Sequence, residues 1–118
     1  MGRLTTHVLD LSRGVAAAGM TIELAAIDAA RGRRVVAQTV TNRDGRCPAP
    51  LIEGDAFLAG AWQLEFHVAS YFSQQGVTLP EPPFLDVVVV RFTVANAGDH
   101  YHVPLLVTPW SYSTYRGS

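Results

Sequence analysis

The stretch AWQLEFHVA, residues 61–69, decides the fold class because its apolar and polar side chains alternate without a break. In an extended chain Trp62, Leu64 and Phe66 share one face with Val68, while Glu65 lies on the opposite face. A slip of one residue in the pairing would bury Glu65, so the register is well specified. The stretch is therefore predicted to be a strand with one face on a hydrophobic core.

Short runs of similar character lie on both sides of this strand, separated by turn-forming sequences such as SRG, NRDG, EGD and NAGD. They predict further strands at residues 4–10, 20–27, 34–41, 85–95 and 100–108. Residues 85–95 carry valine on both faces, which predicts a central strand or one covered by a second layer. Only SYFSQQGV, residues 70–77, breaks the alternation, and there we expect a helix of about two turns ended by Gly76. The pattern predicts an all-β chain of antiparallel sheets packed face to face.

The composition narrows the class of protein. The chain has 118 residues, which predicts one domain over residues 1–118, and its net charge of −1 gives no indication of nucleic acid or an anionic membrane as partner. Its single cysteine, Cys47, excludes an internal disulfide framework. The opening MGRLTTHVLD is too polar for a secretory signal, and no apolar run is long enough to span a bilayer, so we expect a cytoplasmic protein.

Histidine provides the clearest candidates for chemistry. His7 lies in the middle of the first predicted strand, and period-two geometry places the imidazoles of His100 and His102 on one face of another. Such residues can be solvated strand positions, a metal-binding pair or a general base. Cys47 precedes Pro48 in a turn and would need a histidine partner to act as a nucleophile. Arg116, near the end of the chain, has a planar guanidinium suited to a flat polar ligand.

Four motifs together resemble one family. LTTHVLD (4–10), TNRDGR (41–46), HYHVPLL (100–106) and TPWSYSTYRGS (108–118) are similar, in this order and spacing, to the transthyretin-related 5-hydroxyisourate hydrolases. The resemblance covers essentially the whole chain. It implies a transthyretin-like sandwich of two four-stranded sheets with one short helix. It also implies a homotetramer, a dimer of dimers, with active sites in a channel between the dimers.

The resemblance further implies hydrolysis of the small molecule 5-hydroxyisourate to 2-oxo-4-hydroxy-4-carboxy-5-ureidoimidazoline, without a metal or other cofactor. The motifs transfer a catalytic set to this chain: His7, Arg46 and His102. They transfer substrate-binding positions at the end of the chain: Tyr115, Arg116, Gly117 and Ser118. The role of His100 stays open, and so does the choice of general base between His7 and His102.

Two other functions remain open from the sequence. The same fold can serve as a carrier of small ligands, as in transthyretin itself, because fold does not determine function. Alternatively His7, His100 and His102 are three residues that can ligate zinc and leave a position for water, as in zinc hydrolases.

Overall fold

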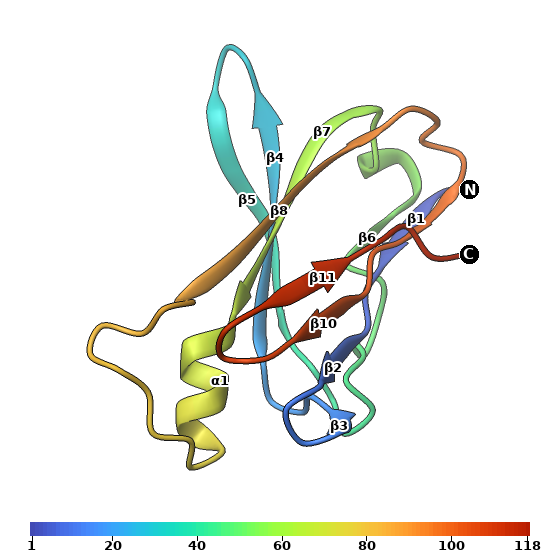
Figure 1. Ribbon diagram of the computed structural model, residues 1–118. Coiled ribbons are helices and arrows are strands. Elements are labelled where there is room, and N and C mark those ends of the chain that lie inside the picture. The colour runs from blue at the N-terminus through green and yellow to red at the C-terminus, as the bar shows by residue number, and fades with distance from the viewer.

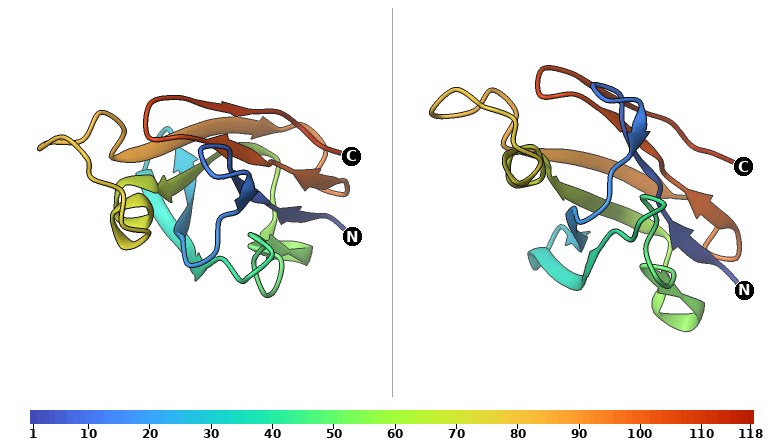
Figure 2. Two further views of the ribbon diagram at one scale, coloured as in Figure 1. Left: turned by 60° about the horizontal axis from the view of Figure 1, so that its bottom comes forward. Right: turned by 90° about the horizontal axis from the view of Figure 1, so that it is seen from below.

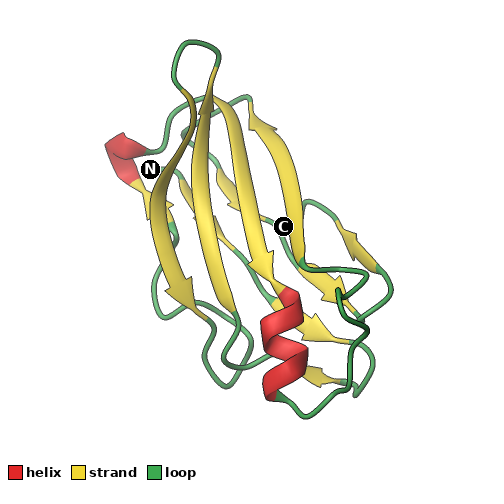
Figure 3. Cartoon of the chain, turned by 90° about the vertical axis from the view of Figure 1, so that its left-hand side faces the viewer, coloured by secondary structure: helices red, strands yellow, loops and turns green.

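The computed structural model describes residues 1–118, which form two layers of strands with a helix at one end (Figure 1). The first layer is a sheet of four long antiparallel strands in the order β5–β4–β7–β8. Figure 3 shows these strands side by side, with the helix below them. Their bounds are Thr21–Asp28 for β4, Gly32–Val40 for β5, Gly60–His67 for β7 and Val87–Val94 for β8.

The second layer is built from shorter strands in two groups, β6–β1–β9 and β11–β10–β2–β3. Two hydrogen bonds join the groups: the amide of Val103 donates to the carbonyl of Thr5 (3.0 Å), and that of Leu105 to His7 (2.9 Å). The layer therefore has four strand positions, namely β6 with β3, β1 with β2, β9 with β10, and β11. The bounds are Arg3–Thr5 (β1), Val8–Asp10 (β2), Val15–Ala16 (β3), Ile52–Glu53 (β6), His100–His102 (β9), Leu105–Val107 (β10) and Tyr112–Thr114 (β11).

The expected sandwich of two four-stranded sheets is thus confirmed, and Figure 2 shows the two layers facing each other. The expectation of purely antiparallel sheets is wrong, because β1 pairs with β9, and β2 with β10, in parallel. Strands β9 and β10 run in the same direction as β1 and β2, and they follow them only after the chain has formed the other sheet. The predicted strands 4–10 and 100–108 are each interrupted, the second at Val103 and Pro104, and proline has no amide hydrogen for a ladder.

Two expectations about exposure also need correction. Strand β8 is an edge strand rather than a central one, and Val89 on its outer face is 47% exposed in the single chain. Glu65 was expected to be buried only if the strand pairing slipped by one residue. It is buried in the observed register. Arg33 from β5 explains this, because its Nε and Nη2 atoms each donate to the Glu65 carboxylate over 2.6 Å. A paired, hydrogen-bonded carboxylate can leave water at acceptable cost.

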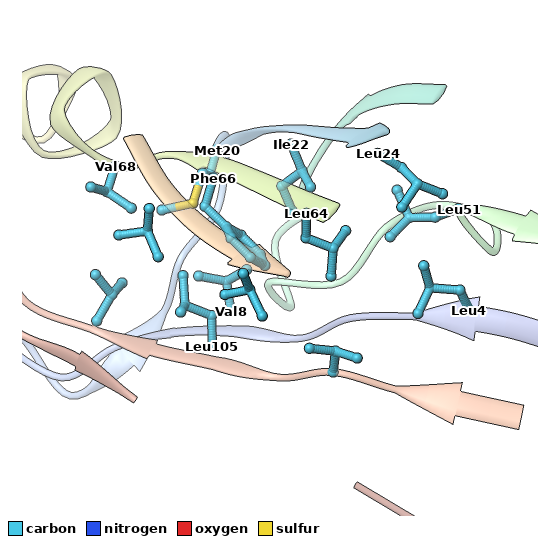
Figure 4. Close-up of a cluster of buried hydrophobic side chains, with 14 of the residues drawn as sticks. Leu4, Val8, Met20, Ile22, Leu24, Leu51, Leu64, Phe66, Val68 and Leu105 are labelled. Carbon is cyan, nitrogen blue, oxygen red and sulfur yellow. The ribbon is translucent and has the colours of Figure 1, made fainter. Parts of the chain in front are cut away.

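The interior between the layers is a single cluster of buried apolar side chains. Leu4, Val8 and Leu105 reach it from the second layer and meet Leu64 and Phe66 of β7 (Figure 4). Thr5, His7 and His102 alternate with the buried residues of their strands and therefore point to the outer side of the second layer. The strand period thus places the candidate chemical residues on the face turned away from the core.

Helix α1 spans Val68–Gln74 and begins two residues before the expected start, while Gly76 follows it with φ of +85°. Buried Asp10 of β2 fixes the helix to the second layer. Its carboxylate accepts from the hydroxyl of Tyr71 (2.9 Å) and from Nε of Arg13 (3.1 Å). A short 3₁₀ helix, η1, spans Gly54–Ala56. No helix in the structure has the length and apolar character needed to cross a membrane.

Candidate active site

A cavity of about 470 Å³ opens on the outer side of the second layer, where Ser118 at the end of the chain reaches it. Its size lies within the range of roughly 300–1,000 Å³ that small-molecule sites occupy. Polar and basic side chains dominate its wall, with a short apolar segment after Arg46 on one side. The lining residues are Thr5, Thr6, Arg46, Cys47, Pro48, Ala49, Pro50, His100, His102 and Ser118.

Three of these side chains form a continuous hydrogen-bonded group. The hydroxyl oxygen of Thr5 lies 2.8 Å from Nδ1 of His102 and 2.7 Å from Nε2 of His100. The parallel pairing places Thr5 opposite His102, and His100 follows on the same face because side chains of a strand alternate. Since Nδ1 of His102 is bound to Thr5, Nε2 is the ring nitrogen left for chemistry in the cavity.

Arg46 is presented by the tight turn that follows β5. The side-chain oxygen of Asn42 accepts the amides of Asp44 (2.9 Å) and Arg46 (3.1 Å), which closes the turn. Gly45 adopts φ of +74°, and a Cβ atom at this position would collide with the carbonyl oxygen of Val8. The turn therefore needs glycine, because an L-residue is disfavoured in this conformation and no room exists for a side chain. The guanidinium of Arg46 forms no hydrogen bond or ion pair within the chain, so its donors are free for a ligand.

His7 lies beside this turn, where it forms an isolated antiparallel bridge with Arg46. Its Nε2 atom is 2.8 Å from the carbonyl oxygen of Asp44. A carbonyl only accepts, so this nitrogen carries a hydrogen, and in the neutral ring Nδ1 holds the lone pair. His7 is near His102 but does not line the cavity in the single chain.

The four terminal positions separate into two pairs. Gly117 pairs with His102, its amide donating to the His102 carbonyl over 2.7 Å, and Ser118 reaches the cavity. Tyr115 and Arg116 instead line a groove between β8 and β11. The guanidinium carbon of Arg116 lies 3.9 Å from the centre of the Tyr101 ring, a cation–π contact. The cavity thus joins Arg46, His102 and Ser118, while Tyr115 and Arg116 face elsewhere.

The surroundings shift the pKa values of two groups that line the cavity, His102 and Cys47. Burial, followed by the positive charges of Arg46 and the neighbouring histidines, lowers the pKa of His102 below its usual value of 6.5. His102 is therefore neutral at pH 7 and able to accept a proton. Burial raises the pKa of the Cys47 thiol to about 11, so this residue stays protonated and is a poor nucleophile.

The histidines do not converge as a zinc site does. His100 and His102 both turn a ring nitrogen toward Thr5, and their ring centres are 6.2 Å apart. Nε2 of His7 is occupied by a backbone carbonyl. The structure brings together no group of three histidine, cysteine or acidic side chains arranged to hold a metal ion. The zinc alternative therefore has no preformed ligand set in this chain.

Thr5 is the residue of the site that sequence reasoning missed. The only available signal was its position two residues before His7 in TTH, which places it on the same strand face. Nothing local indicates that this face meets a strand 97 residues further along the chain.

The two four-stranded layers, the single short helix and the histidine–arginine cavity on the outer sheet define a transthyretin-like sandwich. Residues 4–117 match the model of the HIUase/Transthyretin family, and this chain belongs to that family. It is 58% identical to the 5-hydroxyisourate hydrolase of Ralstonia nicotianae over 100% of both chains.

Two solved structures show the breadth of the family. The 5-hydroxyisourate hydrolase of Klebsiella pneumoniae is 31% identical, with a TM-score of 0.82 over 100% of both chains. Sea bream transthyretin in complex with thyroxine is 30% identical and has a TM-score of 0.87, over 98% of this chain and 94% of that one. Backbone similarity alone therefore does not separate the hydrolases from the carrier, and the site residues must do so.

Proposed function

We propose that this chain hydrolyses 5-hydroxyisourate, opening its six-membered ring at the cyclic amide to give 2-oxo-4-hydroxy-4-carboxy-5-ureidoimidazoline. The observation that carries the proposal is the cavity in which neutral His102 and an unpaired Arg46 guanidinium lie together. The Ralstonia and Klebsiella proteins named as 5-hydroxyisourate hydrolases support it, since both match the full length of this chain.

The chemistry requires an activated water, a polarised carbonyl and a proton for the departing ring nitrogen. Nε2 of His102 takes a proton from water, and the resulting hydroxide adds to the carbonyl carbon. The Arg46 guanidinium stabilises the negative charge that develops on the carbonyl oxygen. When the carbon–nitrogen bond breaks, the nitrogen receives a proton and His102 returns to its neutral form.

His7 shares the acid–base work in this proposal. Its Nε2 hydrogen is held by the Asp44 carbonyl, so the atom available to exchange a proton is Nδ1. Because His7 also borders the turn that presents Arg46, its loss would disturb both proton transfer and the position of the guanidinium.

The substrate contacts proposed for Tyr115, Arg116, Gly117 and Ser118 depend on assembly. We propose a homotetramer, a dimer of dimers of this single-domain chain, in which a neighbouring subunit completes each site. Its support is the exposed apolar surface formed by β8, the loop before it and residues 110–115, which include β11, since apolar patches of this kind mark interfaces. The large exposed side chains there are Phe84, Val89, Trp110, Tyr112 and Tyr115. Light scattering should give about four times the chain mass of 12.8 kDa.

The direct test is an ultraviolet time course of 5-hydroxyisourate generated from urate by urate oxidase. Because the substrate also decays spontaneously, each trace is compared with a blank. We expect decay faster than the blank, in proportion to protein concentration, and unchanged after chelation of metals with EDTA. Loss of activity in EDTA with recovery in zinc would instead favour the zinc hydrolase.

The carrier is the second candidate, supported by the fold shared with the thyroxine-bound transthyretin. A protein that leaves the blank rate unchanged and binds thyroxine would be a carrier.

Cytoplasmic location also stays a prediction, which cell fractionation would test.

A further inference from the structure

The hydroxyl of Thr5 lies between two imidazoles and contacts both. Its oxygen is 2.8 Å from Nδ1 of His102 and 2.7 Å from Nε2 of His100. All three side chains are half-buried, and the rings have no other hydrogen-bond partner within the chain. Both distances are typical of full-strength hydrogen bonds.

The number of hydrogens restricts this arrangement. A threonine hydroxyl has one hydrogen to donate, and a neutral imidazole has one N–H. Thr5 can therefore donate to only one of the two rings. In one direction His100 donates to Thr5, and Thr5 donates to Nδ1 of His102. In the other direction Nδ1 of His102 donates to Thr5, and Thr5 donates to Nε2 of His100. Whenever the hydroxyl hydrogen lies between the rings, the tautomers of the two histidines are linked. If both rings donate to the Thr5 oxygen and its hydrogen points elsewhere, His102 again carries its hydrogen on Nδ1.

The reaction distinguishes the two directions. In the first, Nε2 of His102 already carries a hydrogen and cannot accept one from water. In the second, Nε2 has a free lone pair toward the cavity, as a general base needs. We infer that Thr5 and His100 are positioning residues that hold His102 in its Nδ1–H tautomer, so that Nε2 is the proton acceptor in the cavity. This inference rests on the proposed hydrolysis.

The second direction of hydrogen bonding suits both the neutral and the protonated state of His102. When Nε2 takes a proton, Nδ1 keeps its hydrogen and continues to donate to Thr5, so the hydroxyl does not need to turn. The hydrogen bonds are therefore organised before the proton moves, which avoids reorganisation during the reaction. No net proton passes along the hydrogen bonds that run from His102 through Thr5 to His100. Burial and the Arg46 charge, which lower the pKa of His102, are consistent with a neutral ring at rest.

Steady-state kinetics with 5-hydroxyisourate separate this role from simple packing. Thr5→Val preserves the shape of the side chain but removes its hydroxyl, and Thr5→Ser restores the hydroxyl. We expect Thr5→Val to lower kcat roughly 10- to 100-fold, part of the 10²- to 10⁴-fold that acid–base catalysis supplies. KM should stay within about twofold, and Thr5→Ser should recover most of kcat. Thr21→Val, a half-buried strand threonine of the other sheet without a side-chain hydrogen bond, is the matched control.

His100→Phe tests the direction of the two hydrogen bonds that Thr5 forms. It removes the acceptor for the Thr5 hydrogen, which then turns to Nδ1 of His102 and favours the inactive tautomer. We expect kcat to fall as in Thr5→Val, and the double variant Thr5→Val/His100→Phe to fall little further, since both act through His102. Wild-type kcat in Thr5→Val, or no recovery in Thr5→Ser, would overturn the inference.

Nitrogen-15 NMR of the histidine rings gives a readout that does not need activity. For the wild type at pH 8 we expect His102, assigned by its loss in His102→Asn, to carry its hydrogen on Nδ1. A hydrogen on Nε2 would overturn the inference even if the enzyme is active. A wild type that does not accelerate substrate decay would instead refute the proposed function. In that case, an Nδ1–H signal of His102 that is lost in Thr5→Val would still establish the direction of the hydrogen bond. The hydrogen bond would then have no role in this reaction.

Discussion

The backbone of Gly117 lies directly against the imidazole of His102. Its amide donates to the His102 carbonyl over 2.7 Å, and a Cβ atom built on Gly117 would come within 2.7 Å of Cδ2 of the ring. The opposite side of the same ring is held by Thr5. His102 is therefore clamped between the end of the chain and β1, and the final residues of the chain set the position of the proposed base.

Replacement of Gly117 by alanine should disturb this clamp. A carbon at 2.7 Å is too close for an undistorted contact, so the ring or the terminal strand must move by several tenths of an ångström. We expect Gly117→Ala to lower kcat at least about tenfold, equivalent to about 1.4 kcal/mol, with little change in unfolding free energy. Gly98→Ala, where the new carbon meets only the Asn96 side chain at 3.2 Å, is the control. Equal kcat for both variants would show that the contact does not position His102.

Gly45 should be essential for the presentation of Arg46. In Gly45→Ala a left-handed backbone, which costs about 1–2 kcal/mol for an L-residue, is combined with a collision against the Val8 carbonyl. Gly76→Ala provides a matched control, since Gly76 has φ of +85° but nothing within 4 Å of the new carbon. We expect urea unfolding to show a larger loss of stability for Gly45→Ala than for Gly76→Ala, and only Gly45→Ala to lose activity. Similar stability losses would mean that the turn relaxes around the added carbon.

The pH dependence follows from the lowered pKa of His102. Burial comes first and the positive charge of Arg46 second among its causes. Since only the neutral ring accepts a proton, kcat/KM should fall as the pH drops through a midpoint that lies below 6.5. Arg46→Gln removes one of the charges, so the midpoint should move to higher pH although the rate is also reduced. NMR titration of the His102 ring measures both midpoints, and a wild-type value at or above 6.5 would contradict the account.

The buried contact between Asp10 and Tyr71 should contribute to stability rather than to catalysis. Burial alone would raise the pKa of Asp10, but hydrogen bonds from Ser12, Tyr71 and Arg13 outweigh it and lower that pKa. The folded-state pKa thus lies below the unfolded one. Its stabilisation is present above the unfolded value of about 3.9 and is lost as pH falls through the folded value.

Tyr71→Phe removes one of these donors, and we expect it to cost about 1.5–3 kcal/mol at pH 7. Urea unfolding at a fixed protein concentration measures the loss. Ser73→Ala, which removes an exposed hydroxyl from the same helix, should change stability by less than about 0.5 kcal/mol. A Tyr71→Phe variant as stable as Ser73→Ala would show that solvent replaces the lost donor.

Local periodicity was sufficient to predict which side chains face the core and which face outward. It placed Leu64 and Phe66 in the interior, and His100 with His102 on one shared face of a strand, because these relations depend only on the period of a strand. It could not predict the parallel pairing of β1 with β9, which brings Thr5 to His102. That contact joins segments 97 residues apart and depends on how the whole chain folds. The burial of Glu65 was missed for the same reason, since its partner Arg33 lies on another strand.

Family resemblance supplied the candidate residues, and the geometry sorted them by position. His102, Arg46 and Ser118 share the cavity, while Arg116 stacks on Tyr101 in a separate groove. No sequence motif distinguishes these locations, because they depend on which neighbouring segment each terminal residue meets in the folded chain. The substrate-binding roles of Tyr115 and Arg116 stay predictions.

The most direct test of the account compares His102→Asn with His67→Asn in the 5-hydroxyisourate decay assay. His67 is also half-buried but lies on the outer face of the other layer, bound to Glu23 over 2.8 Å. We predict that His102→Asn reduces the rate above the blank by about 10²- to 10⁴-fold, with the wild-type oligomer retained, and that His67→Asn stays near the wild-type rate. Near-normal turnover by His102→Asn would contradict the proposed active site.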